Sequence, residues 1–305
     1  MSLINAQTDF GVVLDGVTDN TTNLQAAANA AAGGRLYIPA GVCVMGPVQF
    51  PANVEIFGDL IGSTILKRKN NTPGRLIKMS WTVGNSHIRD LTIDGNRQNN
   101  AGITNSDLSL SVNSAIKPAN TARRVEVKNS EYMAVDASGA TYIDQCVLTG
   151  SGQAGVGAGY GIWAAHLSTN GRFTRNTITD FKLSAIFAGG IYSIENNDIL
   201  GCHRDSVPYG GGQVADATNA TIRGQIIGNR IGSGGGAATS GIEVNNAPVI
   251  ILGNHVWDQA NHGIYLQASA QHVVDMCVVK GCGVSGISTA PGVTGHKIGS
   301  MNQIY

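Results

Sequence analysis

Charged residues are scarce in this sequence of 305 residues: they make up 13%, and neither sign predominates. The 20 Lys and Arg residues balance the 20 Asp and Glu residues, and no run of like charge occurs. Proteins that bind nucleic acid or anionic membranes present a basic patch, so the composition argues against both partners. No apolar run reaches the roughly 18 residues that span a membrane, which also argues against a membrane partner.

Cysteine is equally sparse, and its spacing shows neither a CxxC pair nor the His/Cys pattern of a metal site. We therefore expect no metal and no cofactor. An odd number of cysteines cannot all pair within one chain, so buried free thiols are expected, with a local bridge between Cys277 and Cys282 as the alternative. The five residues are Cys43, Cys146, Cys202, Cys277 and Cys282.

Aromatic residues contribute only 6%, whereas glycine is abundant, with 41 residues, and 42% of the chain is hydrophobic. This composition is typical of a β-rich, turn-rich protein. An Asn-x-Ile/Val unit recurs, with Asn spacings of 21, 32, 25 and 48 residues. Its Asn positions are Asn176, Asn197, Asn229, Asn254 and Asn302. The longest spacing covers two repeats, because Met276 stands where the intervening Asn is expected.

A small residue followed by an apolar residue forms a second marker in the same order. Its apolar members are Ile162, Ile186, Val207, Ile242, Ile264 and Ile287. Two markers per repeat indicate at least two short strands and two turns in each repeat. Such a repeat is the rung of a solenoid. The apolar face of a rung is buried only by a neighbouring rung about 4.8 Å away. An Asn at a fixed turn position can form an amide ladder while it adopts left-handed backbone. Leucine-rich and helical repeats are disfavoured, since no LxxLxL pattern and no helical period occur after residue 35.

The whole chain, 1–305, is predicted to be one domain, with an N-terminal cap segment over 8–50 and stacked rungs over 51–305. Polar or Gly-rich stretches predict protruding loops near 99–120 and 209–239. The last residues open a new rung and stop, so further sequence or another chain, as in a homotrimer, is expected to cover that end.

The segment DFGVVLDGVTDNTTNLQAAANAAAGGRLYIPAG predicts a helix through residues 25–32, capped by Asp19 or Thr21, before a strand at Arg35–Ile38. It resembles the N-terminal segment of the pectate-lyase-like superfamily, and IRDLTIDGNRQNN resembles a stretch of mannuronan C5-epimerases. The resemblance implies an all-β, right-handed parallel β-helix that acts on polysaccharides. The superfamily contains lyases, hydrolases, epimerases and phage tailspikes, so the fold alone does not choose the reaction.

The resemblance to epimerases is incomplete at their Asp-Pro-His segment. The comparable stretch here is EYMAVDASGA, which keeps Tyr132 and Asp136 but has Ala137 and Ser138 where Pro and His would stand. The presumed base is therefore missing, which favours hydrolysis over epimerisation. The carboxylate cluster of calcium-dependent pectate lyases and the paired Asp of polygalacturonases have no match either.

Alternation along the strands predicts one outward column beside the inward apolar markers. It consists of Asp136, Trp163, Phe187, Pro208, Glu243, Tyr265 and Ser288. Aromatic rings can stack on the C–H faces of sugars, so we predict that Tyr132, Asp136, Trp163, Phe187, His262 and Tyr265 bind substrate. The alternative is that the rings pack under a loop or against another subunit.

The predicted catalytic residues are Glu243, Asp205, His203 and Arg204. Glu243 and Asp205 are one rung and about three residues apart, a backbone separation of about 11 Å that side chains can shorten to the carboxyl spacing of glycoside hydrolysis. His203 and Arg204 would adjust the acidity of the pair. An ordinary surface ion pair and an isolated Glu are the alternative, and Asp180 with Lys182 form a reserve candidate.

Three functions are consistent with these patterns. The leading hypothesis is a glycoside hydrolase or depolymerase of tailspike or secreted type. The others are a uronate lyase or C5-epimerase and a non-catalytic glycan-binding spike. All three predict a polysaccharide or oligosaccharide partner and a location outside the cell, on a cell surface or on a phage virion.

Overall fold

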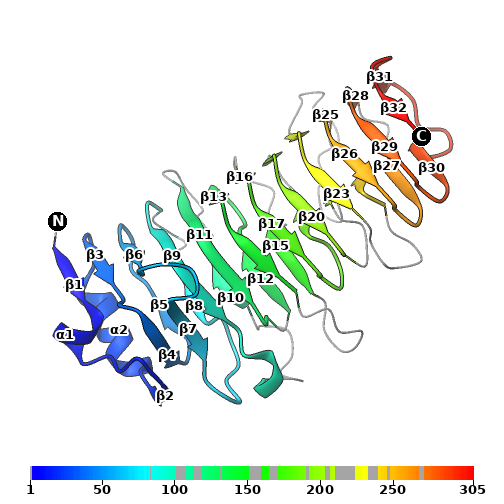
Figure 1. Cartoon of the computed structure of the whole chain (residues 1–305). Coiled ribbons are helices and arrows are strands. Elements are labelled where there is room, and N and C mark those ends of the chain that lie inside the picture. The colour runs from blue at the N-terminus through cyan, green and yellow to red at the C-terminus, as the bar shows by residue number, and fades with distance from the viewer. Residues whose placement is uncertain are drawn as a thin grey trace.

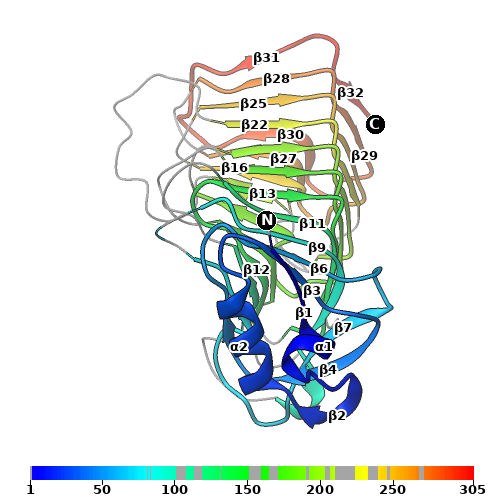
Figure 2. The same cartoon turned by 90° about the vertical axis from the view of Figure 1, so that its left-hand side faces the viewer.

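The computed structural model describes residues 2–80, 82, 84–100, 108–112, 119–130, 132–150, 159–164, 171–189, 192–202, 207–209, 224–232, 240–245, 248–267 and 271–305. These residues form the predicted right-handed parallel β-helix, in which the rungs stack from the N-terminus at one end to the C-terminus at the other (Figure 1). Every strand pair is parallel, and the strands make three faces (Figure 2).

Two of the faces belong to one continuous sheet, since the long strands β9 and β11 each pair with strands of both. The first stack contains β1 (Leu3–Asn5), β3 (Arg35–Tyr37), β6 (Glu55–Phe57), the first half of β9 (His87–Asp94) and of β11 (Asn120–Lys128), β13 (Thr141–Asp144), β16 (Gly171–Thr174), β19 (Tyr192–Glu195), β22 (Gly224–Ile227), β25 (Val249–Leu252), β28 (Val273–Asp275) and β31 (Lys297–Ile298).

The second stack follows the first after a sharp corner. It contains β2 (Asp15–Asp19), β4 (Gly41–Met45), β7 (Thr64–Arg68), the second half of β9 and of β11, β14 (Val147–Thr149), β17 (Thr177–Thr179), β20 (Asp198–Leu200), β23 (Arg230–Gly232), β26 (His255–Trp257), β29 (Val278–Lys280) and β32 (Gln303–Ile304). A 3-10 turn, η1 (Arg97–Asn99), follows β9.

The third face is a separate sheet, which has ten strands in the described part of the chain. These are β5 (Val48–Gln49), β8 (Ile77–Lys78), β10 (Leu108–Ser111), β12 (Met133–Asp136), β15 (Tyr160–Ala164), β18 (Ile186–Ala188), β21 (Val207–Tyr209), β24 (Ile242–Val244), β27 (His262–Leu266) and β30 (Ser285–Thr289). Inward residues from all three faces, such as Phe173, Ile178 and Ile186, are fully buried and form the core.

The predicted Asn ladder lies at the corner between the first and second stacks. The Asn197 side-chain oxygen accepts from the backbone N–H of Asn176 at 3.0 Å and from its amide at 2.9 Å, and Asn197 bonds to Asn229 in the same way. The left-handed residue is not the Asn, however, but the one before it, such as Arg175 or Asn196. The Asn side chain instead points inward, where it satisfies the backbone of the turn.

The ladder also corrects the expectation for Met276. Met276 occupies the left-handed corner position and is exposed, whereas Cys277 takes the ladder position. The backbone N–H of Cys277 donates to the side-chain oxygen of Asn302 at 3.0 Å. All five cysteines are free, so the alternative bridge between Cys277 and Cys282 is not formed.

The small residue of the second marker is explained by the turn into the ten-stranded sheet. A Cβ atom on Gly263 would lie 2.2 Å from the Cγ1 atom of Val279 and 2.7 Å from the carbonyl oxygen of Gly286. Such distances are well inside van der Waals contact, so a larger residue would force the rungs apart. The recurrence of Gly at this position therefore reflects close approach within the stack.

The N-terminal end carries two helices, α1 (Ala6–Phe10) and α2 (Thr21–Ala30). The expected cap at Asp19 or Thr21 is wrong, since Asn20 holds the cap position and its buried amide bonds to the backbone of Val13. Asp19 instead accepts hydrogen bonds from the side chain and backbone N–H of Thr21, and these lower the pKa of its carboxyl to about 2.

Both predicted loops need correction, because each contains strands. The stretch 99–120 includes β10, where Leu110 is fully buried between β8 and β12. The stretch 209–239 includes β22 and β23, anchored by buried Ile226 and Ile231. The remaining parts, 101–107, 113–118, 210–223 and 233–239, lie outside the described residues. No helix in the described part of the chain has the length and apolarity to cross a bilayer.

Candidate functional site

The outward column predicted from the sequence follows the register of the ten-stranded sheet. Asp136 pairs with Trp163, Trp163 with Phe187, Pro208 with Glu243, and Glu243 with Tyr265. Their inward neighbours Ile162, Ile186, Ile242 and Ile264 are fully buried. The column is therefore a real feature of one face, while the roles of its members stay predictions.

Four aromatic side chains form a continuous cluster on this face: Tyr132, Tyr160, Trp163 and Phe187, here called the aromatic cluster. The rings of Trp163 and Phe187 stack nearly in parallel, with centroids 4.4 Å apart and planes inclined by 8°. Tyr160 meets the edge of Trp163 at 4.7 Å, and Tyr132 meets Tyr160 at 6.2 Å. All four rings are partly exposed.

Tyr160 is a member of this cluster that sequence reasoning missed. Strict alternation from inward Ile162 assigns Tyr160 to the interior. The chain breaks that alternation at the start of β15, where Gly161 and Ile162 are buried in succession and Tyr160 is partly exposed. The available signal was an aromatic residue, Tyr160, directly before Gly161 and three positions before Trp163 of the column.

Asp136 differs from the rest of the column because its side chain is only 7% exposed. Arg75 makes an ion pair with it, with 3.2 Å between the guanidinium nitrogen and the carboxylate oxygen. The Ser138 hydroxyl donates to the same carboxylate at 3.1 Å, and Arg75 also donates to Ser111 at 3.3 Å. Asp136 thus keeps its predicted outward register position, but its carboxylate is covered and bound to protein donors instead of being open to solvent.

Glu243 lies farther along the column and is partly exposed. Its Oε1 atom accepts from the side-chain amide of Gln267 and, at 3.5 Å, from that of Asn245. On the next rung His262 stacks on Tyr265 with centroids 4.5 Å apart, and its Nδ1 atom lies 2.8 Å from the Ser285 hydroxyl. Partial burial lowers the pKa of His262, so this ring tends to be neutral near pH 7.

The two carboxylates of the column are too far apart to act on one bond. Four strand steps separate Asp136 from Glu243, which is about 19 Å at the spacing of neighbouring strands. The two carboxyl groups of a glycosidase lie within about 10 Å of each other. The predicted partners of Glu243, namely His203, Arg204 and Asp205, lie outside the described residues.

Metal ligation finds no support in the part of the chain described. Within those ranges, no three His, Cys, Asp or Glu side chains come together as a ligand set.

Asp180 and Lys182, the reserve candidate, lie in the turn between β17 and β18, and Asp180 adopts left-handed backbone there.

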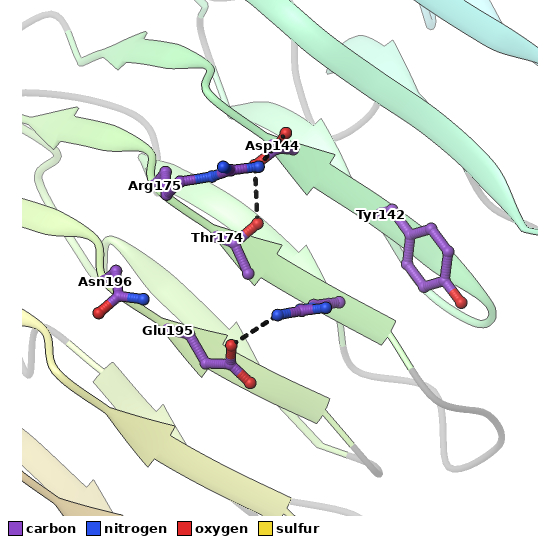
Figure 3. A pocket seen from close by; sticks show the side chains of 7 residues that line it. Tyr142, Asp144, Thr174, Arg175, Glu195 and Asn196 are labelled. Carbon is purple, nitrogen blue, oxygen red and sulfur yellow. Dashed lines mark hydrogen bonds and ion pairs between the residues drawn. The ribbon is translucent and has the colours of Figure 1, made fainter.

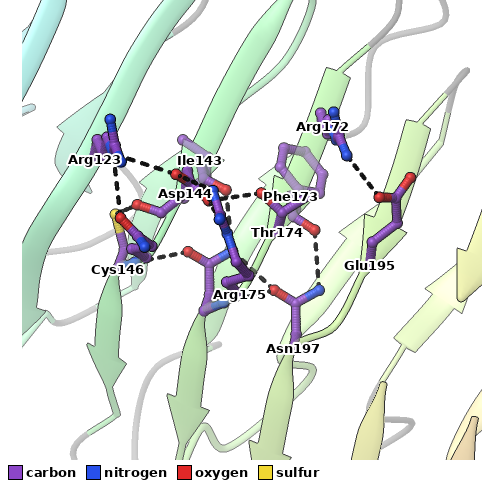
Figure 4. A network of polar contacts seen from close by, with 12 residues as sticks. Arg123, Ile143, Asp144, Cys146, Arg172, Phe173, Thr174, Arg175, Glu195 and Asn197 are labelled. Carbon is purple, nitrogen blue, oxygen red and sulfur yellow. Dashed lines mark hydrogen bonds and ion pairs between the residues drawn. The ribbon is translucent and has the colours of Figure 1, made fainter. Parts of the chain in front are cut away.

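A separate pocket of about 440 Å³ opens on the first stack, over β13, β16 and β19 (Figure 3). Sequence reasoning missed it, because its residues come from three rungs. Arg175 binds Asp144 with two hydrogen bonds, of 2.9 and 2.8 Å, and Arg172 donates to Glu195 at 2.8 Å (Figure 4). The pocket is lined by Tyr142, Asp144, Arg172, Thr174, Arg175, Glu195 and Asn196.

Comparison with known proteins gives partial sequence matches, and no protein-family model matches the chain. Over 110 residues the chain is 34% identical to mannuronan C5-epimerase AlgE4 of Azotobacter vinelandii, across 31% of this chain and 20% of that protein. It is 36% identical over 110 residues to the tail spike protein of Shigella phage Sf6, across 32% of this chain and 17% of that protein. The chain thus spans a fifth or less of the length of these curated relatives.

Solved structures match over the whole chain. The A-module of the same epimerase superposes with a TM-score of 0.58 at 20% identity, covering 100% of this chain and 97% of that one. The Dettilon tailspike protein superposes with a TM-score of 0.70 at 15% identity, covering 99% of this chain and 68% of that one. The predicted fold, a right-handed parallel β-helix, is confirmed.

Proposed function

We propose that this pectate-lyase-like parallel β-helix binds a polysaccharide along the outer face of its ten-stranded sheet and hydrolyses glycosidic bonds there. The observation that carries the proposal is the parallel stack of Trp163 on Phe187, followed two strands later in the same column by Glu243. Two strand steps amount to about 10 Å. A sugar chain held on the rings therefore reaches the carboxylate.

The aromatic cluster supplies the binding energy in this proposal. Trp163 and Phe187 cover each other's facing ring surfaces, so the partly exposed rings present their edges and their remaining apolar surface to the C–H groups of sugars, and the stacking keeps them in a single orientation. A preformed surface loses little conformational entropy when a ligand binds. Tyr265, which His262 holds in place by stacking, would extend the same surface past Glu243.

Glu243 is the proposed catalytic carboxylate. Gln267 holds it through its Oε1 atom, and a carboxylate positioned in this way can activate water or attack the anomeric carbon. Asp205, which precedes β21 in the sequence and lies outside the described residues, is the proposed partner that protonates the leaving oxygen, and Arg204 and His203 would tune the pair. The role of Glu243 is testable independently of these three residues.

The experiment that tests the function is a screen of the wild-type chain against polysaccharides with neutral and acidic repeats, including alginate, pectate and hyaluronan. Hydrolysis predicts new reducing ends without the ultraviolet absorbance of an unsaturated uronate product. A product with that absorbance would show that the reaction is elimination and not hydrolysis. Binding without product from any polymer would reduce the function to glycan attachment.

Trp163→Ala is expected to weaken binding of the polysaccharide that the screen identifies by about tenfold, because a buried aromatic contact contributes on the order of 1 kcal/mol beyond its area. The measurement is the dissociation constant by titration calorimetry. Trp257→Ala is the matched control, since Trp257 lies on β26 of the second stack, where it packs beside His255. Equal affinity of wild type and Trp163→Ala would remove the aromatic cluster from the binding site.

A second candidate, elimination or epimerisation of a uronate polymer, is favoured by one observation at Asp136. Its buried carboxylate is paired with Arg75, and an arginine beside a carboxylate is the kind of group that can hold the carboxylate of a uronate. The partial sequence match to a mannuronan C5-epimerase points the same way. Loss of activity in Arg75→Gln with full activity in Glu243→Gln would favour this candidate.

Either reaction implies a chain that works where polysaccharides are found, outside the cell, on its surface or on a phage virion. The homotrimer expected from the sequence stays a prediction. Sedimentation analysis of the purified chain measures it directly.

A further inference from the structure

We propose that the pocket on the first stack, over β13, β16 and β19, is a second glycan site that binds a uronic acid residue. It is lined by Tyr142, Arg172 and Arg175, which belong to a different face from the aromatic cluster (Figure 2). The site is non-catalytic and does not depend on the proposed hydrolysis. It would hold an acidic polymer to the side of the helix.

The charges in and beside the pocket favour an anion. Two guanidinium groups of the lining, those of Arg172 and Arg175, balance its two carboxylates, Asp144 and Glu195, and the guanidinium of Arg123, which is not part of the lining, lies 3.4 Å from Asp144 (Figure 4). The cluster therefore carries one net positive charge. The three arginine side chains are 52 to 58% exposed, whereas the two carboxylates are 15 to 18% exposed. An arriving ligand thus meets the cationic groups first.

The carboxylates are already engaged as acceptors. Asp144 accepts from Thr174 at 2.8 Å as well as from the Nε and Nη2 atoms of Arg175. Glu195 accepts from Ser193, from Gln225 at 2.6 Å and from Arg172. These donors outweigh the burial of Glu195, so the pKa of its carboxyl is lowered and it stays charged. A neutral sugar, whose hydroxyls would seek acceptors here, finds few.

The arginines of the pocket have more N–H donors than the carboxylates beside them accept. Each guanidinium has five N–H groups, and in the described part of the chain Arg172 donates to Glu195 through a single nitrogen. The planar fork of an arginine matches the two oxygens of a carboxylate. The amide of Asn196 lines the same pocket from an exposed corner position. The chemistry of the pocket therefore calls for a ligand with carboxylate oxygens.

The volume of the pocket and the exposed ring of Tyr142 favour a sugar acid over a small inorganic anion as the ligand. The pocket volume of about 440 Å³ falls within the range of about 300–1,000 Å³ typical of organic ligands. Tyr142, which is 43% exposed, lies at the edge of the pocket (Figure 3). Its ring offers a flat face for a pyranose, while the arginines take the carboxylate.

The test is titration calorimetry with trimers of galacturonate, mannuronate and guluronate, in the Glu243→Gln background so that nothing is cleaved. We expect binding of at least one trimer, weakened by salt. Arg172→Gln is expected to reduce the affinity at least about tenfold, because hydrogen bonds to charged groups contribute that much. The neutral methyl ester of the bound trimer is expected to lose affinity to the same extent.

The controls separate this site from the outer face of the ten-stranded sheet. Arg230→Gln removes a comparably exposed arginine, paired with Asp198 at 3.4 Å outside the pocket, and should leave the affinity unchanged. Tyr142→Phe should retain binding and Tyr142→Ala should lose it. Binding that is lost in Trp163→Ala but insensitive to Arg172 and Tyr142 would overturn this site while supporting the proposed function. Absence of binding to all three trimers would also overturn it.

Discussion

Glu243→Gln is expected to lower the rate of glycosidic bond cleavage by about a hundred- to ten-thousand-fold, the range that a positioned acid or base contributes. The substitution keeps the shape of the side chain and replaces the oxygen that activates water or attacks carbon by an amide, which cannot take a proton. Gln267 and Asn245, which hold the carboxylate, remain in place. The measurement is the release of reducing ends from the polymer found by the screen.

Binding should survive this substitution, because the aromatic cluster is untouched. The matched control is Glu126→Gln, which changes a glutamate on the second stack that accepts hydrogen bonds from Thr92 and Lys128. That variant should cleave at the wild-type rate. Full activity of Glu243→Gln would exclude this residue from the mechanism and favour the second candidate, which rests on Asp136 and Arg75.

Asn197→Ala is expected to lower the free energy of unfolding by about 3 kcal/mol or more, since each buried polar group left without a partner costs about 1–3 kcal/mol. The Asn197 side-chain oxygen accepts from the backbone and the amide of Asn176, and its own amide donates to the carbonyl of Phe173 at 3.0 Å. All of these groups are buried, so water does not replace the lost bonds. Chemical denaturation measures the effect.

A neighbouring residue provides the control for the ladder. Asn196 is exposed at the left-handed corner position, and glycine accepts that backbone conformation readily, so Asn196→Gly should change stability little. An equal loss in the two variants would mean that the corner itself, and not the amide ladder, stabilises the stack. A small effect of Asn197→Ala would show that neighbouring rungs relax to satisfy the freed groups.

The register of the ten-stranded sheet is predictable because parallel rungs repeat the same turn, so a marker in one rung aligns with the marker in the next. For this reason the sequence pattern alone predicts Trp163, Phe187 and Glu243 in one column, and the strand register agrees. The same reasoning fails where a rung departs from strict alternation. Tyr160 lies beside the column because Gly161 and Ile162 are buried in succession.

The Asn ladder shows that the sequence pattern also fails to assign roles to individual residues at the corner. The recurring Asn identifies the corner, but the pattern does not reveal that the preceding residue takes the left-handed conformation, nor that Cys277 replaces Asn in one rung. The residue whose side chain bonds to the buried backbone of the corner and the residue whose backbone makes the turn are adjacent in the sequence. Only the hydrogen bonds in the structure tell the two positions apart.

By itself, the sequence of this protein determined the repeating rung, the capping segment and the outward column, because each depends on local period and on residues adjacent in the chain. The tertiary structure alone decided which side chains of different rungs meet. It buried Asp136 against Arg75 and brought Asp144, Arg172 and Glu195 to one pocket. Such contacts join residues from neighbouring rungs or from rungs farther apart, and insertions between rungs hide their spacing from any periodic pattern.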